Sequence, residues 1–174
     1  LDRDGTISDS QTKTYDLKGS DPISAIDIIY EATNGATSNT GHPLHKDISK
    51  IEVVDGSDVL FSLSAPQLAA LNFYEMGKYP FHDLNEAAAA VQKEKFTIHF
   101  GRWIGDQKLY FDPSRFDNPQ LKLTHALAIS ATAGFATGTG KVTAIAKLFD
   151  EKPPAPDGFL MSKDLFDWTT VASG

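Results

Sequence analysis

The chain has 174 residues, of which 41% are hydrophobic and 22% charged. That is enough for one domain with a buried core and too few for two domains of usual size. The formal net charge is −7 and there is no cysteine, which excludes disulfides, thiolate metal sites and cysteine nucleophiles. The acidic balance argues against a specific nucleic-acid partner, which would need clustered Lys and Arg. No apolar run approaches the roughly 20 residues of a membrane-spanning helix.

Residues 1–20 are rich in Gly, Ser, Asp and Thr, with Ile7, Tyr15 and Leu17 as apolar anchors. This composition predicts a polar N-terminal arm or a short edge strand. We expect no buried strand in the first few residues.

The pentapeptide DRDGT in this segment fits the D-x-D-G-T pattern of haloacid dehalogenase-type phosphatases. There Asp2 would attack a phosphoryl group and Asp4 would protonate the leaving oxygen. Such a nucleophile follows a buried parallel strand, which this polar segment does not supply. Asp106 and Asp112, the nearest candidates for a metal-binding pair, lie between β-like stretches. We therefore expect a polar turn and no enzyme, and rank a phosphatase third among the candidate functions.

Residues 23–33 place Ile26, Ile28 and Tyr30 on one side of an extended chain and Asp27 on the other. A period of two is typical of a strand with one buried face. The first long strand is therefore expected here.

A long exposed loop, rich in Asn, Gly and Thr, is expected over residues 34–47. Residues 48–54 and 58–64 then alternate apolar and polar side chains on either side of Asp55-Gly56-Ser57. This pattern predicts a hairpin whose glycine adopts a positive φ.

Ser64 and Gln67 fit an S-x-x-Q capping box, which predicts a short helix that ends at Gly77. The alanine-rich residues 85–95 have high helix propensity, with Asn85 as a cap, and predict a second helix. One or two helices therefore interrupt the strands.

The second half of the chain returns to β patterning. Apolar side chains alternate with polar ones in three further stretches, separated by segments rich in Gly, Pro and Asn. These predicted strands are residues 95–103, 120–130 and 141–149. Seven or eight short strands with few helices predict an all-β fold, an eight-stranded antiparallel jelly-roll β-sandwich or barrel.

Histidine is the commonest metal ligand, but none of the five histidines has the spacing of a metal centre. Because His125 lies on the apolar face of its strand, we expect it to be a core residue. A G-x-S-x-G elbow and a complete phosphate-binding loop are both missing from the sequence, so no metal and no cofactor are expected. The histidines are His42, His45, His82, His99 and His125.

Several stretches carry a family resemblance, in chain order PISAIDIIYEATNG, HKDISKIEVVDGSDVLFSLSAPQLAALNFYEMGKYP, FTIHFGRWIGD, FDNPQLKLTHALAIS and GFLMSKDLFDWTT. Together they resemble the first, N-terminal barrel of the double jelly-roll major capsid proteins. Tailless icosahedral bacteriophages with internal membranes, adenovirus and large DNA viruses share this group. The resemblance covers roughly residues 20 to 170 and rests on the order and spacing of elements.

The resemblance implies a structural protein of a bacteriophage or prophage capsid, located in the virion after assembly in the host cytoplasm. Its implied partners are copies of itself, in a trimer or pseudo-hexameric capsomer, other virion proteins and an internal membrane. Such proteins usually carry two barrels, so we expect either an amino-terminal portion or a single-barrel subunit. The expected organisation is a polar arm at 1–20, a jelly roll at 21–158, and a strand or connector toward a second barrel or neighbouring subunit at 159–174.

In such a shell the lateral faces of the barrel make the contacts, and aromatic side chains are favoured anchors. Two groups of apolar residues that the barrel does not obviously need are the expected interface candidates. The first group can instead close the barrel end, and the second follows a proline cluster. They are Phe73, Tyr74, Tyr79 and Phe81 near the helix exit, and Phe159, Leu160, Phe166 and Trp168 near the carboxyl end.

The competing class is a jelly-roll carbohydrate-binding, lectin-like module. Trp103, Tyr110 and Trp168 would then stack on sugar rings. No calcium-binding cluster of acidic residues accompanies them, so this reading ranks second.

Overall fold

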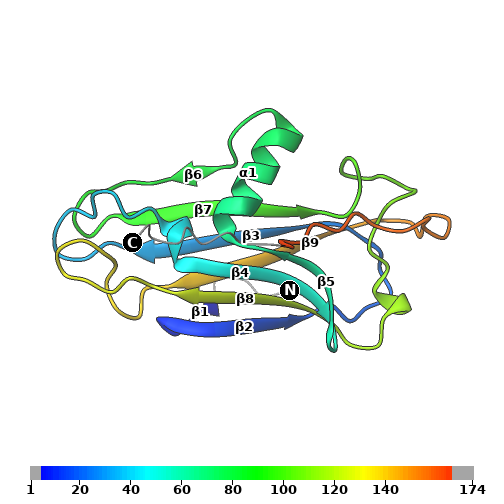
Figure 1. Ribbon diagram of the computed structural model, residues 1–174, viewed down its shortest axis with the longest axis horizontal. Coiled ribbons are helices and arrows are strands. Elements are labelled where there is room, and N and C mark those ends of the chain that lie inside the picture. Colours follow the sequence, from blue (N-terminus) through cyan, green and yellow to red (C-terminus); the bar gives the residue numbers. More distant parts are fainter. Residues whose placement is uncertain (1–4, 166–174) are drawn as a thin grey trace, which may run out of the picture.

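The computed structural model describes residues 5–165 and shows two packed antiparallel sheets (Figure 1). The five-stranded sheet contains, in order, β1 (Gly5–Thr6), β9 (Lys141–Leu148), β3 (Ile23–Thr33), β7 (Val91–His99) and β6 (His82–Asp83). The four-stranded sheet contains β2 (Ser10–Asp16), β8 (Pro119–Ala126), β4 (Ile48–Asp55) and β5 (Asp58–Leu63). All pairings between these strands are antiparallel. The predicted all-β sandwich is confirmed.

The core lies between the inner faces of the two sheets. Ile26 and Ile28 of β3 are buried, as are Ile51 of β4 and Leu121 and Leu123 of β8. Because successive side chains of a strand point to opposite faces, alternate residues of each strand reach this core. Burial of apolar surface is the main force that holds the sheets together.

The N-terminal segment enters the sandwich. Residues 10–16 form β2, an edge strand that pairs with β8 from Ser10 opposite Ala126 to Asp16 opposite Gln120. The edge-strand alternative therefore holds for these residues. Residues 1–4, which include Asp2 and Asp4, lie outside the described part of the chain.

The first long strand and the hairpin form where the sequence predicts them. β3 spans residues 23–33, and β4 and β5 meet at a turn where Gly56 has a φ of +58°. A register shift leaves Leu60 as an extra residue of β5, because Val53 pairs with Phe61 and Val54 with Val59. Such a bulge twists a strand and disrupts its free edge.

The predicted helix is α1 (Ala65–Met76). Ser64 and Gln67 form both hydrogen bonds of the capping box, and Gly77 ends the helix in the left-handed conformation with a φ of 68°. The capping-box and glycine predictions are both confirmed.

The prediction of a second helix over residues 85–95 is wrong. Residues 91–95 belong to β7, which pairs with β3 over nine consecutive positions. Residues 85–90 form turns, held by the amide of Asn34, which donates to the carbonyl oxygens of Asn85 and Ala87 at 2.7 and 2.8 Å. Pairing with a long central strand outweighs the local helix propensity of the alanines.

Three further expectations need correction. The loop at 34–47 is not wholly exposed, because Asn34, Asn39 and Leu44 are buried and a 3-10 turn, η1 (Leu44–Asp47), leads into β4. The strand expected at 120–130 ends at Ala126, and that expected at 95–103 ends at His99. In both, glycine-containing turns stop the pairing earlier than the apolar pattern suggests.

Helix α1 covers the outer edge of β7 (Figure 1). The Asn72 side chain donates to the carbonyl oxygen of Thr97 at 2.7 Å and accepts from its N–H at 2.9 Å. The N–H of Lys95 donates to the carbonyl of Phe81, and β6 pairs with the residues before it. An uncovered strand edge is a template for pairing with other chains, so this arrangement closes one side of the sandwich.

Replacing Asn72 with alanine should lower the free energy of unfolding by about 2–4 kcal/mol, because two buried backbone groups of Thr97 lose their partners. Urea unfolding followed by circular dichroism measures the change. The matched control, Tyr74→Ala on the exposed face of the same helix, should differ from wild type by less than about 0.5 kcal/mol. An unfolding curve of Asn72→Ala that overlays the wild type would contradict the role of this amide.

Candidate assembly surface

The first predicted interface group lies on the surface. The buried side of α1 carries Leu68, Ala69 and Asn72, so the helix turns Phe73 and Tyr74 away from the sheets. Tyr74 is 82% exposed, and the rings of Phe73 and Tyr74 meet edge to face with centroids 5.5 Å apart.

The segment that leaves α1 adds two more exposed aromatic side chains. Tyr79 and Phe81 are both exposed, and the ring of Tyr79 packs edge to face on His82. Scattered apolar side chains are normal on a protein surface, but a cluster of aromatic ones is typical of a contact site. Phe73, Tyr74, Tyr79 and Phe81 therefore remain candidate contact residues, and we call these four residues the α1 surface.

A second apolar group beside α1 was not predicted. Met76 at the end of α1 lines a hollow together with Trp103 and Ile104, and all three side chains are exposed. The sequence signal is the run FGRWIG, in which glycines on either side of Trp103 and Ile104 indicate a turn that presents both side chains. Their approach to Met76, far away in sequence, depends on the tertiary fold.

The residues of the second predicted interface group lie in different environments. Phe159 is half-buried in an aromatic cluster with Phe100, Phe111 and Phe116, at centroid distances of 6.1, 5.4 and 5.9 Å. Leu160 is exposed. Phe166 and Trp168 lie outside the described residues.

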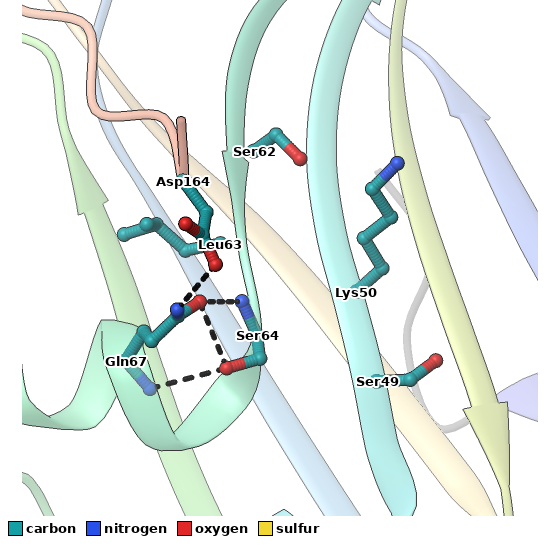
Figure 2. A pocket seen from close by; sticks show the side chains of 7 residues that line it. All are labelled: Ser49, Lys50, Ser62, Leu63, Ser64, Gln67 and Asp164. Carbon is teal, nitrogen blue, oxygen red and sulfur yellow. Dashed lines mark hydrogen bonds between the residues drawn. The ribbon is translucent and has the colours of Figure 1, made fainter. Parts of the chain in front are cut away.

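The chain after Phe159 runs along the free edge of β5. Ser62 donates its N–H to the carbonyl of Ser162 at 2.9 Å and accepts the N–H of Asp164 at 3.0 Å. Figure 2 shows the Asp164 carboxylate against Gln67, whose amide donates to it at 2.7 Å. An anion in the first turn of a helix is favoured by the helix dipole. The segment 160–165 is thus a strap that joins β5 to the start of α1.

A polar hollow of about 280 Å³ lies beside this strap. Ser49 and Lys50 of β4 form its opposite wall (Figure 2). Lys50 forms an ion pair of 2.8 Å with Glu52, and Gln67 bonds within the capping box and to Asp164. These polar groups already have partners within the protein.

His42 and His45 each contact a different carboxylate. His42 contacts Asp47 at 2.7 Å and His45 contacts Glu94 at 2.8 Å, so the two imidazoles do not share a ligand set. No cluster of three His, Cys, Asp or Glu side chains suited to a metal occurs within residues 5–165. The His45–Glu94 pair attaches η1 to β7, whereas the His42–Asp47 pair joins η1 to the loop before it.

His125 is buried, as predicted for a core histidine. Its Nδ1 lies 3.0 Å from the Tyr30 hydroxyl. Burial lowers the pKa of His125, which favours the neutral ring.

Trp103 and Tyr110 do not form the common sugar platform that the second-ranked reading requires. Tyr110 is fully buried and its hydroxyl donates to the Pro154 carbonyl at 2.7 Å. Trp103 stands on the surface without it, and Trp168 lies outside the described residues.

The acidic residues once considered for a phosphatase have structural roles. Asp106 accepts from the Arg102 guanidinium at 2.8 Å and from the N–H groups of Lys108 and Leu109, and these bonds hold its pKa well below the ordinary range. Asp112 caps a turn at Ser114. Since the sheets of residues 5–165 are antiparallel, they do not offer the parallel frame that this phosphatase chemistry needs.

The outer face of the five-stranded sheet contains a charged cluster. Asp27 forms ion pairs with Lys95 and Lys147 at 2.8 and 3.0 Å and accepts the Thr97 hydroxyl at 2.7 Å. Burial raises the pKa of Asp27, but these hydrogen bonds outweigh it and leave the pKa below its ordinary value. The cluster ties β3, β7 and β9 together.

No protein-family model matches the chain, and neither does any curated protein. Among solved structures, the crystal structure of the STIV major capsid protein is similar, with a TM-score of 0.59 at 13% sequence identity. The likeness covers 84% of this chain and 46% of that chain.

The fold is a jelly roll. The jelly-roll prediction is therefore confirmed. The described residues contain no helix long and apolar enough to cross a bilayer. The chain spans less than half the length of the capsid protein it matches.

Replacing Asp27 with asparagine should destabilise the protein at neutral pH by about 1–3 kcal/mol, because Lys95 and Lys147 lose their shared carboxylate. The pKa of Asp27 is depressed in the folded state, so its contribution is present above about pH 4 and is lost as the pH falls through the folded-state pKa. Thermal unfolding from neutral to acidic pH should show the gap between variant and wild type closing.

The matched control for this prediction is Asp58→Asn, at an exposed position of the β4–β5 hairpin. It should leave stability within about 0.5 kcal/mol of wild type at each pH. A gap for Asp27→Asn that stays constant into the acidic range would show that the charge of Asp27 is not what stabilises the sheet.

Proposed function

We propose that the protein is a structural subunit of a bacteriophage or prophage capsid, and that it builds an icosahedral shell through lateral contacts between jelly rolls. The observation that carries this proposal is the structural likeness to the STIV major capsid protein over 84% of the chain. The proposal assigns the protein no chemical reaction. It locates the protein in the virion, after assembly in the host cytoplasm.

The α1 surface supports this proposal. Its aromatic side chains are exposed in the isolated chain, and aromatic residues are enriched where interfaces are most tightly packed. Helix α1 is anchored to β7 through Asn72, so Phe73 and Tyr74 stand on a rigid element. A rigid anchor loses less conformational entropy when it is buried.

The strap supports a second contact region. Leu160, Met161 and Leu165 are exposed, and Leu165 is 88% accessible. With Phe166 and Trp168 close behind in sequence, this end of the chain carries apolar side chains beyond those that the described core buries. Our proposal makes the carboxyl end, including Phe159 as its internal anchor, a connector toward a second barrel or a neighbouring subunit.

The proposed partners are further copies of this chain in a trimer or pseudo-hexameric capsomer, together with other virion proteins and an internal membrane. Because the chain spans 46% of the matched capsid protein, a second barrel can belong to the same polypeptide or to another subunit. Closed rings of subunits need complementary lateral faces. The α1 surface is the proposed contribution of this chain to such a face.

Tyr74→Arg should weaken self-association, because a charged side chain would be buried at the centre of the proposed contact. Light scattering coupled to size exclusion should show concentration-dependent assembly of the wild type, and the variant should weaken it at least about 30-fold, as expected for a hot-spot residue. Thr14→Arg, on the exposed face of β2, is the matched control and should assemble normally. A wild type that stays monomeric at every concentration, with or without the carboxyl-terminal residues, contradicts the proposal.

A further inference from the structure

The strap joins β5 as a very short parallel strand. Its pairing with β5 places Lys163 opposite Ser62. Ser62 donates its N–H to Ser162 and accepts the N–H of Asp164, so one residue of β5 carries both backbone bonds. The Asp164 carboxylate also accepts from Gln67 in the first turn of α1 (Figure 2). Ser62 and Gln67 thus form a binding site for a short extended segment, which we call the strap site.

The apolar side chains of the strap remain on the surface. Leu160 is 40% exposed, Met161 56% and Leu165 88%. Burial of apolar surface is the main force in folding and in most protein association, whereas a hydrogen bond adds little net stability because water competes for its groups. Polar bonds therefore hold the strap in register, while its apolar side chains stay available for a further contact.

The attachment of the carboxyl segment to the core ends at Leu160. The Leu160 N–H donates to the Phe100 carbonyl at 2.8 Å, and Phe159 before it packs on the Phe100 ring. Residues 161–165 follow this point, and five residues in extended form reach about 17 Å. They can leave their own β5 for the β5 of a neighbouring copy without disturbing Phe159.

We propose that residues 161–165 are exchanged between two copies of the chain on assembly, so that each strap occupies the strap site of its neighbour. This inference rests on the proposed assembly role and names the partner of the carboxyl end. A site that binds a segment of its own chain offers the same hydrogen bonds to the identical segment of another copy. Exchange of an identical element is therefore a low-cost route to association.

Met161 distinguishes the exchanged form from the closed one. Leu160 is fixed to its own chain and Ser162 is bonded on β5, so two exchanged straps cross at Met161. Reciprocal exchange between two copies has twofold symmetry, which brings each Met161 side chain against its counterpart. A methionine side chain adapts readily to such packing. The exchanged form thus buries apolar surface that the closed form leaves exposed.

Concentration determines which form is populated. A tethered segment has a high effective concentration at its own site, so the strap of a dilute chain lies on its own β5. When assembly brings copies together, the strap site of a neighbour competes on similar terms. We therefore expect exchange in the assembled protein and the closed form in the monomer.

Disulfide trapping tests the exchange, because the chain has no cysteine. The single variants Ser62→Cys and Lys163→Cys are mixed in dilute solution, concentrated until light scattering shows assembly, and oxidised. Residues paired on adjacent strands lie within reach of a disulfide. A dimer joined through positions 62 and 163 of different chains should be the main product, identified by mass spectrometry of its peptides.

The matched control for random collision mixes Thr14→Cys with Lys163→Cys. Because Thr14 pairs with Lys122 of β8 and not with the strap, this mixed dimer should form at least about tenfold more slowly. The double variant Ser62→Cys/Lys163→Cys, oxidised as a dilute monomer, should close within one chain. Locked in this way, it should assemble at least about tenfold more weakly than after reduction.

The outcomes separate exchange from the assembly role on which it rests. Assembly with no 62–163 dimer above the control overturns the exchange and leaves assembly through the α1 surface standing. Equal assembly of the locked and the reduced double variant overturns the exchange in the same way. A wild type that is monomeric at every concentration overturns both proposals.

Discussion

The closure of the β7 edge is the constraint on which the rest of the surface depends. Without α1, the backbone N–H and carbonyl groups of Thr97 would be free to pair with another chain. The side-chain amide of Asn72 forms the two hydrogen bonds that a neighbouring strand would otherwise form with this residue. This pair of hydrogen bonds fixes the rotation of α1 about its axis. With Asn72 turned inward, Phe73 and Tyr74 must point outward. The same rotation brings Met76 toward Trp103, so one edge closure sets both the α1 surface and the hollow beside it.

The strongest period-two patterns were enough to predict β3 and the β4–β5 hairpin, because each buries one face against the opposite sheet. The capping box could be predicted equally well, because Ser64 and Gln67 interact within one helical turn. Residues 85–95 were predicted wrongly because their alanines favour a helix locally, whereas their pairing partner, β3, lies far away in sequence. For residues 10–16 the sequence allows two alternatives, because an edge strand with few apolar side chains resembles a polar arm.

The candidate sites also differ in how far the sequence could predict them. Exposed aromatic residues near the helix exit could be predicted, because they exceed what the core needs. The hollow could not, because Glu75, His99 and Trp103 meet only after α1 has packed on β7 and the turn after β7 has folded back. The sequence offers Trp103 and Tyr110 together as sugar-stacking side chains, but Tyr110 is buried and bonds to Pro154. Sequence spacing therefore identified the side chain and not its companions.

The Gln67 side chain forms hydrogen bonds with two different segments of the chain. The same side chain closes the capping box with Ser64 and holds the Asp164 carboxylate of the strap. The first turn of α1 and the position of the carboxyl end are therefore thermodynamically linked. Whatever draws the carboxyl end away from β5 also takes a stabilising anion from the start of the helix that presents the aromatic side chains. A contact made at the carboxyl end of a chain would therefore be coupled to one made at α1 of the same chain through the Gln67 amide.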